Sequence, residues 1–203
     1  ETLHETLDLC LSCKGCKNEC PANVDMARMK SEFQQHYYDE NGTPISAEIF
    51  GNYRRYARLA SIVPWLANFL ASFVLTRWVM DWWGGTSSER QLPEFASQRF
   101  SAWFRGRDSL SAEEAEQTVW LFACPFTEFN DPEVGRAAVR VLEAAGVRVE
   151  LLPIEEDGRT QLSKGLVDRA RDITRENLET LEPLFEEYPD RPIVGLEPGA
   201  LLT

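Results

Sequence analysis

The sequence predicts an α+α/β chain, in which a helical, cysteine-bearing domain precedes a small parallel-sheet α/β module. Three observations predict this order: four cysteines within residues 10–20, apolar residues at helical spacing up to residue 83, and apolar runs separated by a helix beyond residue 119. We place the boundary near Ser109, in a polar, turn-rich stretch, so that the two domains comprise residues 1–108 and 109–203. The chain stops at Thr203 without a closing helix, which predicts a truncated module.

The first domain is expected to be helical throughout. After Pro21, residues 22–25 offer capping side chains to a helix whose apolar positions recur from Met26 to Phe33. A turn at residues 41–44 precedes two or more helices over residues 45–83. Residues 62–80 are the most apolar stretch, but their unbroken apolar part is shorter than the roughly 20 residues that a membrane span needs.

The second domain alternates strands and helices. The continuous apolar run over residues 119–123 is typical of a buried parallel strand, and residues 147–152 and 192–196 are the second and third predicted strands. Between them, residues 132–145 form an amphipathic helix that ends at Gly146, and residues 162–188 are helical with an interruption near Pro183. This alternation predicts a parallel sheet covered by helices.

The cysteines carry the strongest functional signal. Cys10, Cys13, Cys16 and Cys20 follow the pattern C-x2-C-x2-C-x3-C and precede Pro21, which is typical of a ferredoxin-type [4Fe-4S] site. We expect these four thiolates to be the metal and cofactor ligands. The fourth cysteine of such a run usually ligates a different cluster. Either Cys20 closes the same cluster, or a second cysteine run lies outside these residues.

A structural zinc site in a non-enzymatic interaction module is the alternative, because four thiolates also bind Zn²⁺ tetrahedrally. Zinc sites usually use two C-x2-C pairs separated by a longer loop, so three cysteines at successive two-residue gaps favour the iron-sulfur interpretation. The clustering of the cysteines also argues against a disulfide framework.

Composition limits the other functions. The net charge of −12 over 203 residues argues against a nucleic-acid partner, since phosphate neutralisation needs clustered Lys and Arg. No secretory signal is apparent, so we expect a cytoplasmic location. The alternative is a cytoplasmic protein bound to the inner face of the cell membrane. His4 and His36 lie outside any nucleophile motif, and no phosphate-binding glycine loop is present. We therefore assign no catalytic residue and expect the catalytic domain to lie elsewhere.

Several stretches together resemble a known family. They are residues 7–21 (LDLCLSCKGCKNECP), 23–26 (NVDM), 41–42 (NG), 63–64 (VP), 90–93 (RQLP), 131–135 (DPEVG) and 142–146 (LEAAG). The chain resembles the C-terminal iron-sulfur region, ferredoxin plus cysteine-rich module, of FAD-linked D-lactate and glycolate dehydrogenase-like oxidoreductases. A second, weaker resemblance is to the iron-sulfur subunits of anaerobic glycerol-3-phosphate dehydrogenase and heterodisulfide reductase.

The first resemblance implies an oxidoreductase in which a flavin domain oxidises a 2-hydroxy acid. Electrons would then pass through [4Fe-4S] clusters to a quinone or other acceptor. It implies cluster ligation by Cys10, Cys13, Cys16 and Cys20, and it implies FAD on a part of the protein absent from this chain. The implied partners are a flavin dehydrogenase domain or subunit and the electron acceptor.

The second module departs from that family. Its relatives carry paired cysteines before a Gly-Arg step and another after a Glu-Pro step, whereas this chain has Glu156-Asp157 and Gly199-Ala200 there. We therefore expect no second metal site and expect Cys124 to be a buried apolar residue.

An aromatic series runs along residues 65–83. It comprises Trp65, Phe69, Phe73, Trp78, Trp82 and Trp83. Packing around the cluster is the favoured interpretation of this series, because a cubane cluster needs an apolar surround. Peripheral contact with a membrane that contains quinone is the alternative.

Overall fold

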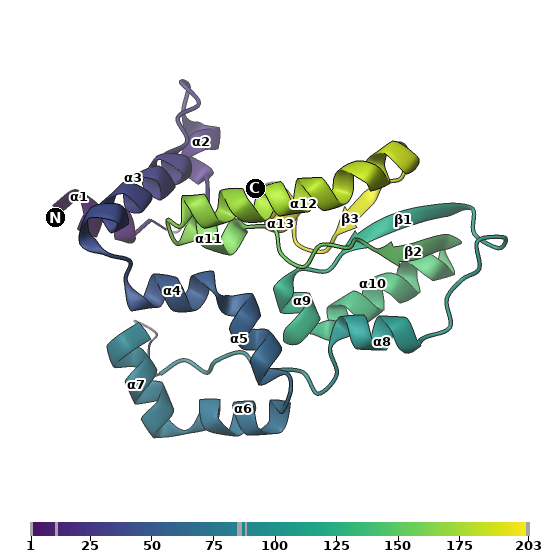
Figure 1. Cartoon of the computed structure of the whole chain (residues 1–203), viewed down its shortest axis with the longest axis horizontal. Helices are drawn as coiled ribbons and strands as arrows, with labels where there is room; N and C mark the ends of the chain where they lie inside the picture. Colours follow the sequence, from purple (N-terminus) through teal and green to yellow (C-terminus); the bar gives the residue numbers. More distant parts are fainter. Residues whose placement is uncertain (1, 11, 85–86, 88, 202–203) are drawn as a thin grey trace.

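The computed structural model describes residues 2–10, 12–84, 87 and 89–201, and it is mostly helical with one three-stranded parallel sheet (Figure 1). The predicted combination of helices followed by a parallel α/β module is confirmed at this level. The first part contains seven helices among its described residues: α1 (Thr2–Asp8), α2 (Gly15–Glu19), α3 (Met26–Asn41), α4 (Ile45–Gly51), α5 (Tyr53–Ala60), α6 (Pro64–Ser72) and α7 (Val74–Gly84).

Helix α3 follows the cysteine segment, residues 10–25, and is the longest of these seven helices. Its start is capped by Asp25, whose carboxylate accepts a hydrogen bond from the backbone N–H of Arg28 at 3.0 Å. It ends where Gly42 adopts a φ of 85° and donates its N–H to the carbonyl of Tyr38 at 2.8 Å. The capping predicted for residues 22–25 is therefore performed by Asp25.

The sheet has the order β2-β1-β3, with all strands parallel. Strand β1 (Gln117–Phe122) is central, β2 (Val147–Leu151) pairs Val149 with Val119, and β3 (Ile193–Gly195) pairs Val194 with Leu121. The helices of this part are α8 (Phe100–Gly106), α9 (Pro125–Phe129), α10 (Pro132–Ala144), α11 (Arg159–Ser163), α12 (Val167–Glu187) and α13 (Pro198–Leu201). Helix α12 continues through Pro183, so the interruption predicted there is wrong.

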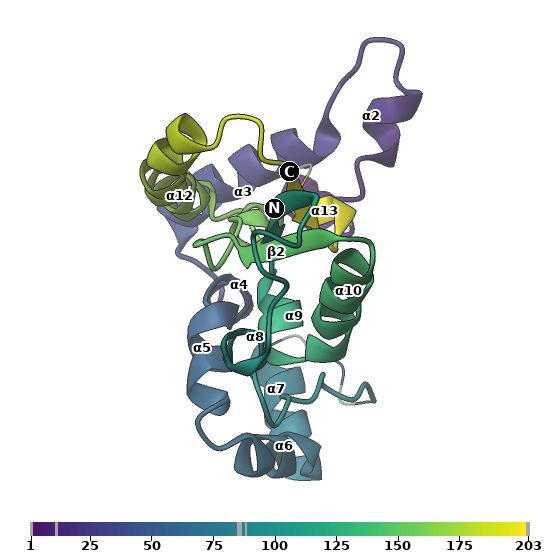
Figure 2. The same cartoon turned by 90° about the vertical axis from the view of Figure 1, so that its right-hand side faces the viewer.

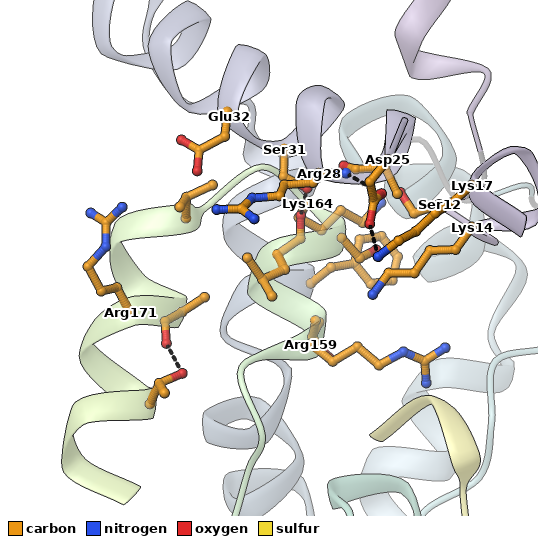
Figure 3. Close-up of a pocket in the computed structure, with 18 of the residues that line it drawn as sticks. Ser12, Lys14, Lys17, Asp25, Arg28, Ser31, Glu32, Arg159, Lys164 and Arg171 are labelled. Carbon is orange, nitrogen blue, oxygen red and sulfur yellow. Dashed lines mark hydrogen bonds and ion pairs between the residues drawn. The ribbon is translucent and has the colours of Figure 1, made fainter. Parts of the chain in front are cut away.

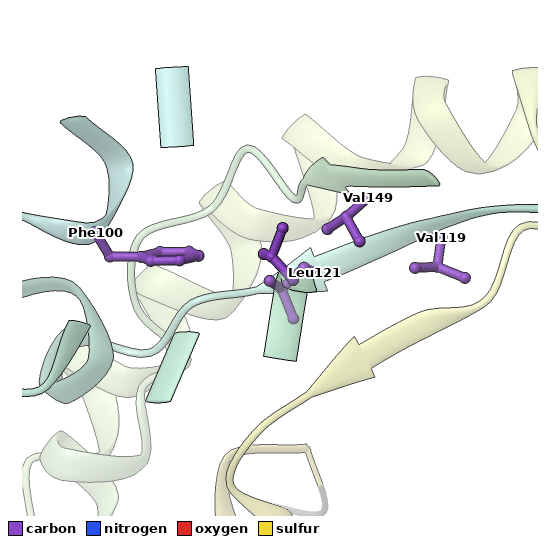
Figure 4. Close-up of a cluster of buried hydrophobic side chains, with 5 residues drawn as sticks. Phe100, Val119, Leu121 and Val149 are labelled. Carbon is purple, nitrogen blue, oxygen red and sulfur yellow. The ribbon is translucent and has the colours of Figure 1, made fainter. Parts of the chain in front are cut away.

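Alternate residues of β1 belong to two separate apolar clusters, as the period of a strand requires. Val119 and Leu121 pack with Phe100 of α8 and Val139 of α10 (Figure 4). On the opposite face, a second cluster joins β1 to α12 and comprises Trp120, Phe122, Cys124, Leu152 and Leu181. Helices therefore cover both faces of the sheet, as expected for parallel strands.

Helix α8 lies before the predicted boundary at Ser109 but contributes to the core of the sheet. Phe100 is fully buried among sheet residues, and Gly135 of α10 lies so close to its ring that an added Cβ would be 2.7 Å from it. The α/β core thus recruits chain from both sides of Ser109, and the division at that residue stays a prediction.

The two parts are tied together through α11 and α12. The hydroxyl of Ser31 on α3 donates to the carbonyl of Leu162 at 2.8 Å, and the amide of Gln161 donates to the carbonyl of Gly51 at 2.8 Å. The guanidinium of Arg169 binds both carboxylate oxygens of Glu48, at 2.6 and 2.8 Å. Helices α3 and α4 of the first part are therefore held against α11 and α12 of the second.

The aromatic series does not pack around the cysteine segment, so that prediction is wrong. Helices α6 and α7 lie at the end of the molecule opposite α2 in both views (Figures 1 and 2). Trp65 and Trp82 are 72% and 74% exposed, and Phe69, Phe73 and Trp78 are also exposed. The side chain of Trp83 falls outside the described residues. Within the described residues, no helix combines the length and apolar character that crossing a bilayer requires.

Candidate metal site

The four clustered cysteines lie on three successive pieces of backbone. Cys10 follows α1, Cys13 lies in the loop before α2, Cys16 is within α2, and Cys20 immediately follows that helix. All four are free thiols, with Cys13 and Cys16 exposed and Cys10 and Cys20 half-buried. We call residues 10–25 the cysteine segment; Leu11, which the predicted motif includes, falls outside the described residues.

The backbone of the cysteine segment contains several tight turns. Ser12, Lys14 and Asn23 have φ values of 54°, 58° and 54°, a conformation that non-glycine residues rarely adopt. The N–H of Lys17 donates to the carbonyl of Lys14 at 3.1 Å, and that of Asn23 donates to the carbonyl of Cys20 at 2.9 Å. Such backbone turns leave N–H groups pointing outward, where sulfur or other anions accept them.

Cys20 shows this effect. Hydrogen bonds from the backbone N–H groups of Val24 and Ala22, and to a smaller extent Asn23, lower the pKa of its thiol. Because the thiolate is the form that binds metal, these amides favour ligation by Cys20. In the sequence, the residue pair Cys20-Pro21 was the clue to these hydrogen bonds, since a tight backbone turn is needed to point successive N–H groups at one sulfur atom.

Lysine side chains gather around the cysteine segment, although the chain contains only four of them. Lys14 and Lys17 belong to the segment. The buried ammonium of Lys30 donates to the carbonyl of Cys10 at 2.7 Å. Burial lowers the pKa of Lys164, and the nearby charge of Lys30 lowers it further. Sequence reasoning missed Lys30 and Lys164, and the scarcity of lysine was the one clue to them.

The donor set fits an iron-sulfur cluster in chemical kind: four free thiols, amide support at Cys20, and positive charge nearby to balance thiolates. Their positions are not convergent, however, since no group of three or more His, Cys, Asp or Glu in the described residues is placed to hold one metal ion. Metal ligands are commonly ordered by the metal itself. A cluster held by Cys10, Cys13 and Cys16 would therefore require these three thiols to draw together.

Of the two carboxylates that stand where relatives of the second module have paired cysteines, Glu156 forms an ion pair with Arg54, which also pairs with the neighbouring Glu155. Glu197, of the Glu-Pro step, pairs with Arg159. Burial raises the pKa of the Asp157 carboxyl. Cys124 is buried in the core on the α12 side of the sheet, in agreement with its expected apolar role.

Neither histidine joins the cysteine segment. His4 of α1 stacks on the ring of Tyr37 at a centroid distance of 4.1 Å, which fastens α1 to α3, and His36 is exposed. Their arrangement is that of packing and surface residues, respectively.

Comparison with known proteins shows that the chain is similar to parts of dehydrogenases. It is 27% identical over 207 residues to D-2-hydroxyglutarate dehydrogenase of Escherichia coli K12, covering 98% of this chain and 20% of that protein. The Haemophilus influenzae protein of the same name is 24% identical over 204 residues, again 20% of its length. The chain thus spans one fifth of the length of these relatives.

A second kind of relative is one of the subunits of anaerobic glycerol-3-phosphate dehydrogenase from Escherichia coli K12. It is 27% identical over 117 residues, which cover 57% of this chain and 29% of that protein. No family model and no solved structure matches the chain. At low identity, the relatives thus support the oxidoreductase role that the sequence predicts.

Proposed function

We propose that this chain is the iron-sulfur, electron-transferring part of a flavin-linked 2-hydroxy-acid dehydrogenase. The observation that carries the proposal is the cysteine run, in a segment with turn geometry and positive surroundings, on a chain similar to dehydrogenases over nearly its whole length. A bound [4Fe-4S] cluster accepts and releases single electrons. The chain's own residues supply the ligands, the charge environment and the separation from solvent.

Cys10, Cys13 and Cys16 are the proposed ligands of one cluster, and Cys20 is the fourth thiolate of the run, for this cluster or for a second. The proposed iron-sulfur domain is residues 1–108, and residues 109–203 form the α/β module. FAD belongs to a partner domain or subunit outside this chain. The name of the 27% identical hydroxyglutarate dehydrogenase makes a 2-hydroxy dicarboxylate a candidate substrate of the complete protein.

The acceptor side of the proposal rests on α6 and α7. Exposed Trp65, Trp78 and Trp82 suit a membrane interface, where indole rings sit between headgroups and hydrocarbon. Arg55 and Arg58 on the preceding helix α5 line a pocket together with Ile62, which comes just before α6, and their positive charge suits anionic headgroups. A quinone dissolved in such a membrane is the proposed acceptor.

The cluster is tested by anaerobic reconstitution of the chain with iron and sulfide. We expect iron and sulfide to be retained, a broad absorption near ~400 nm, and a paramagnetic resonance signal after reduction. Cys10→Ser, Cys13→Ser and Cys16→Ser should each lose most of the iron, whereas Cys124→Ser should retain it. Cys20→Ser reports whether Cys20 serves this cluster. A colourless protein that holds zinc would replace the redox proposal with the structural zinc site.

Membrane contact is tested by co-sedimentation with vesicles. Binding to vesicles containing phosphatidylglycerol should exceed binding to pure phosphatidylcholine. The double variant Trp65→Ser/Trp82→Ser should lose most of it, because both side chains are exposed and their removal leaves the core intact. Val141→Ser, an equally exposed apolar position on α10, is the control. Equal binding by all three proteins would contradict the proposal.

A further inference from the structure

A cavity of about 950 Å³ lies between the cysteine segment, α3, and the helices α11 and α12 (Figure 3). Its volume is at the upper end of the range of small-molecule sites, roughly 300–1,000 Å³. Two of its walls are joined, because the hydroxyl of Ser31 on α3 donates to the carbonyl of Leu162 on α11, and both residues line the cavity.

The lining of this cavity is strongly basic. Seven lysine or arginine side chains line it against two carboxylates, in a chain whose net charge is −12. Acidic residues therefore dominate the rest of the chain, while the positive charge is concentrated here. A concave site lined by one sign of charge focuses the field and attracts ions of the opposite sign.

Part of this positive charge is not neutralised by the protein. Lys14, Arg28 and Lys164 take part in none of the ion pairs found among the described residues. The Lys164 ammonium lies 4.5 Å from the centre of the Phe50 ring, and its burial lowers its pKa. A half-buried ammonium outside any ion pair gains most from an anionic ligand.

Two separate elements aim at the same part of the cavity. Figure 3 shows Lys14 and Lys17 extending from the cysteine segment toward the side where Arg159 enters from the start of α11. Arg159 follows β2, and its guanidinium lies against Gly199 after β3, where an added Cβ would be 2.6 Å from the guanidinium carbon. This is the carboxyl edge of the parallel sheet, where open α/β sheets bind their ligands.

From these observations we propose that the cavity binds a small molecule with two or more anionic oxygens, of the phosphate or polycarboxylate class, between Lys14 of the cysteine segment and Arg159 and Lys164 of the α/β module. The ligand would bridge the two parts beside the cysteines. This site goes beyond the proposed electron transfer and does not depend on it, because none of the three side chains is a proposed cluster ligand.

The test is titration calorimetry of the metal-free chain with inorganic phosphate and, separately, with citrate, at constant ionic strength set by potassium chloride. We expect saturable binding of at least one of the two anions. The double variant Lys14→Gln/Arg159→Gln should weaken it by roughly tenfold or more, the effect of losing charge-assisted hydrogen bonds. Binding of phosphate alone assigns a phosphoryl group, and binding of citrate alone assigns carboxylates.

Two controls complete the test. Arg140→Gln removes an exposed arginine of α10 that does not line the cavity, and it should bind like the wild type. Lys14→Arg/Arg159→Lys keeps both charges and should retain most of the affinity. Absence of saturable binding for both anions, or undiminished binding by the Gln variant, overturns the proposal. Repeating the titration and iron analysis on the reconstituted chain separates this failure from failure of the cluster proposal.

Discussion

The ammonium of Lys30 lies 2.7 Å from the carbonyl oxygen of Cys10 and only 5% of the residue is exposed. Lys30 takes part in none of the ion pairs among the described residues. A buried cation without a paired carboxylate is costly unless an anion comes near it. Thiolates gathered around a cluster would be such an anion, on the same loop that the ammonium already holds.

Replacing Lys30 by methionine removes the charge and keeps an unbranched side chain that is one atom shorter. If the cysteine segment holds a cluster, Lys30→Met should lower its midpoint potential, because the reduced, more negative state loses a stabilising charge. Iron loss to a chelator should be roughly tenfold faster, a typical effect of removing a supporting group near a metal site. Potentiometric titration of the reconstituted chain and the chelation rate measure the two effects.

The charge-conserving variant Lys30→Arg should retain a potential close to that of the wild type, and Arg140→Gln should not change it. A Lys30→Met potential equal to the wild-type value would show that Lys30 acts only through packing.

Cys20 should ionise at lower pH than an ordinary thiol. Its thiolate accepts backbone hydrogen bonds, chiefly from Val24 and Ala22, which lowers its pKa. In the metal-free chain, the rate of alkylation at Cys20 should therefore rise with a midpoint below the usual thiol pKa of about 8.5. Mass spectrometry of alkylated peptides across a pH series gives this midpoint, and a value at or above about 8.5 would contradict the amide contacts.

Tyr53 should make the fold sensitive to alkali. Its hydroxyl donates to Asn130, and burial raises its pKa to about 12 from an ordinary 10.0. The neutral phenol is therefore favoured in the fold, so its stabilisation is complete below pH 10 and is lost as the pH rises toward 12. Tyr53→Phe should cost about 1 kcal/mol at neutral pH, from the lost hydrogen bond, and this deficit should shrink above pH 10.

Urea unfolding of both proteins at neutral and alkaline pH measures the difference. Tyr56→Phe, an exposed tyrosine on the same helix, is the matched control and should show no such pH dependence. A deficit that stays constant across the pH series would refute the buried position of the Tyr53 phenol.

Gly135→Ala should destabilise the module, although alanine favours a helix by about 1 kcal/mol over glycine. The added Cβ would be 2.7 Å from the ring of Phe100 and 2.9 Å from Thr127, inside a packed core. Overpacking of this kind typically costs about 1–3 kcal/mol, and denaturant unfolding would measure it. Gly106→Ala, at a glycine with open space around it, should be neutral or stabilising.

The regular elements of the α/β module were predictable because their signals are local. The predicted strands at residues 119–123 and 147–152 became β1 and β2 almost unchanged, and the four buried residues of β1 are all apolar. The predicted helix over 132–145 appears as α10. The break expected at Pro183 failed because the proline only removes one hydrogen bond, which the packing of α12 on the sheet outweighs.

The aromatic series shows why periodicity alone was insufficient. The helical spacing of the aromatic residues Trp65, Phe69 and Phe73 predicts an apolar face on α6, but it does not predict what packs against that face. The structure places α6 and α7 away from the cysteine segment and leaves these side chains exposed.

By itself, the sequence determined the cysteine spacing, the strands and the main helices, because each depends on residues close together along the chain. Only the tertiary structure decided where the positive side chains lie. Lys30 donates to the carbonyl of Cys10, Lys164 lies near Lys30, and Arg159 lines the same cavity as Lys14. The last two pairs are brought together by packing of α3 and α4 on α11 and α12, through contacts between residues more than 100 positions apart. Long-range packing of this kind leaves no period or spacing in the sequence from which it could be read.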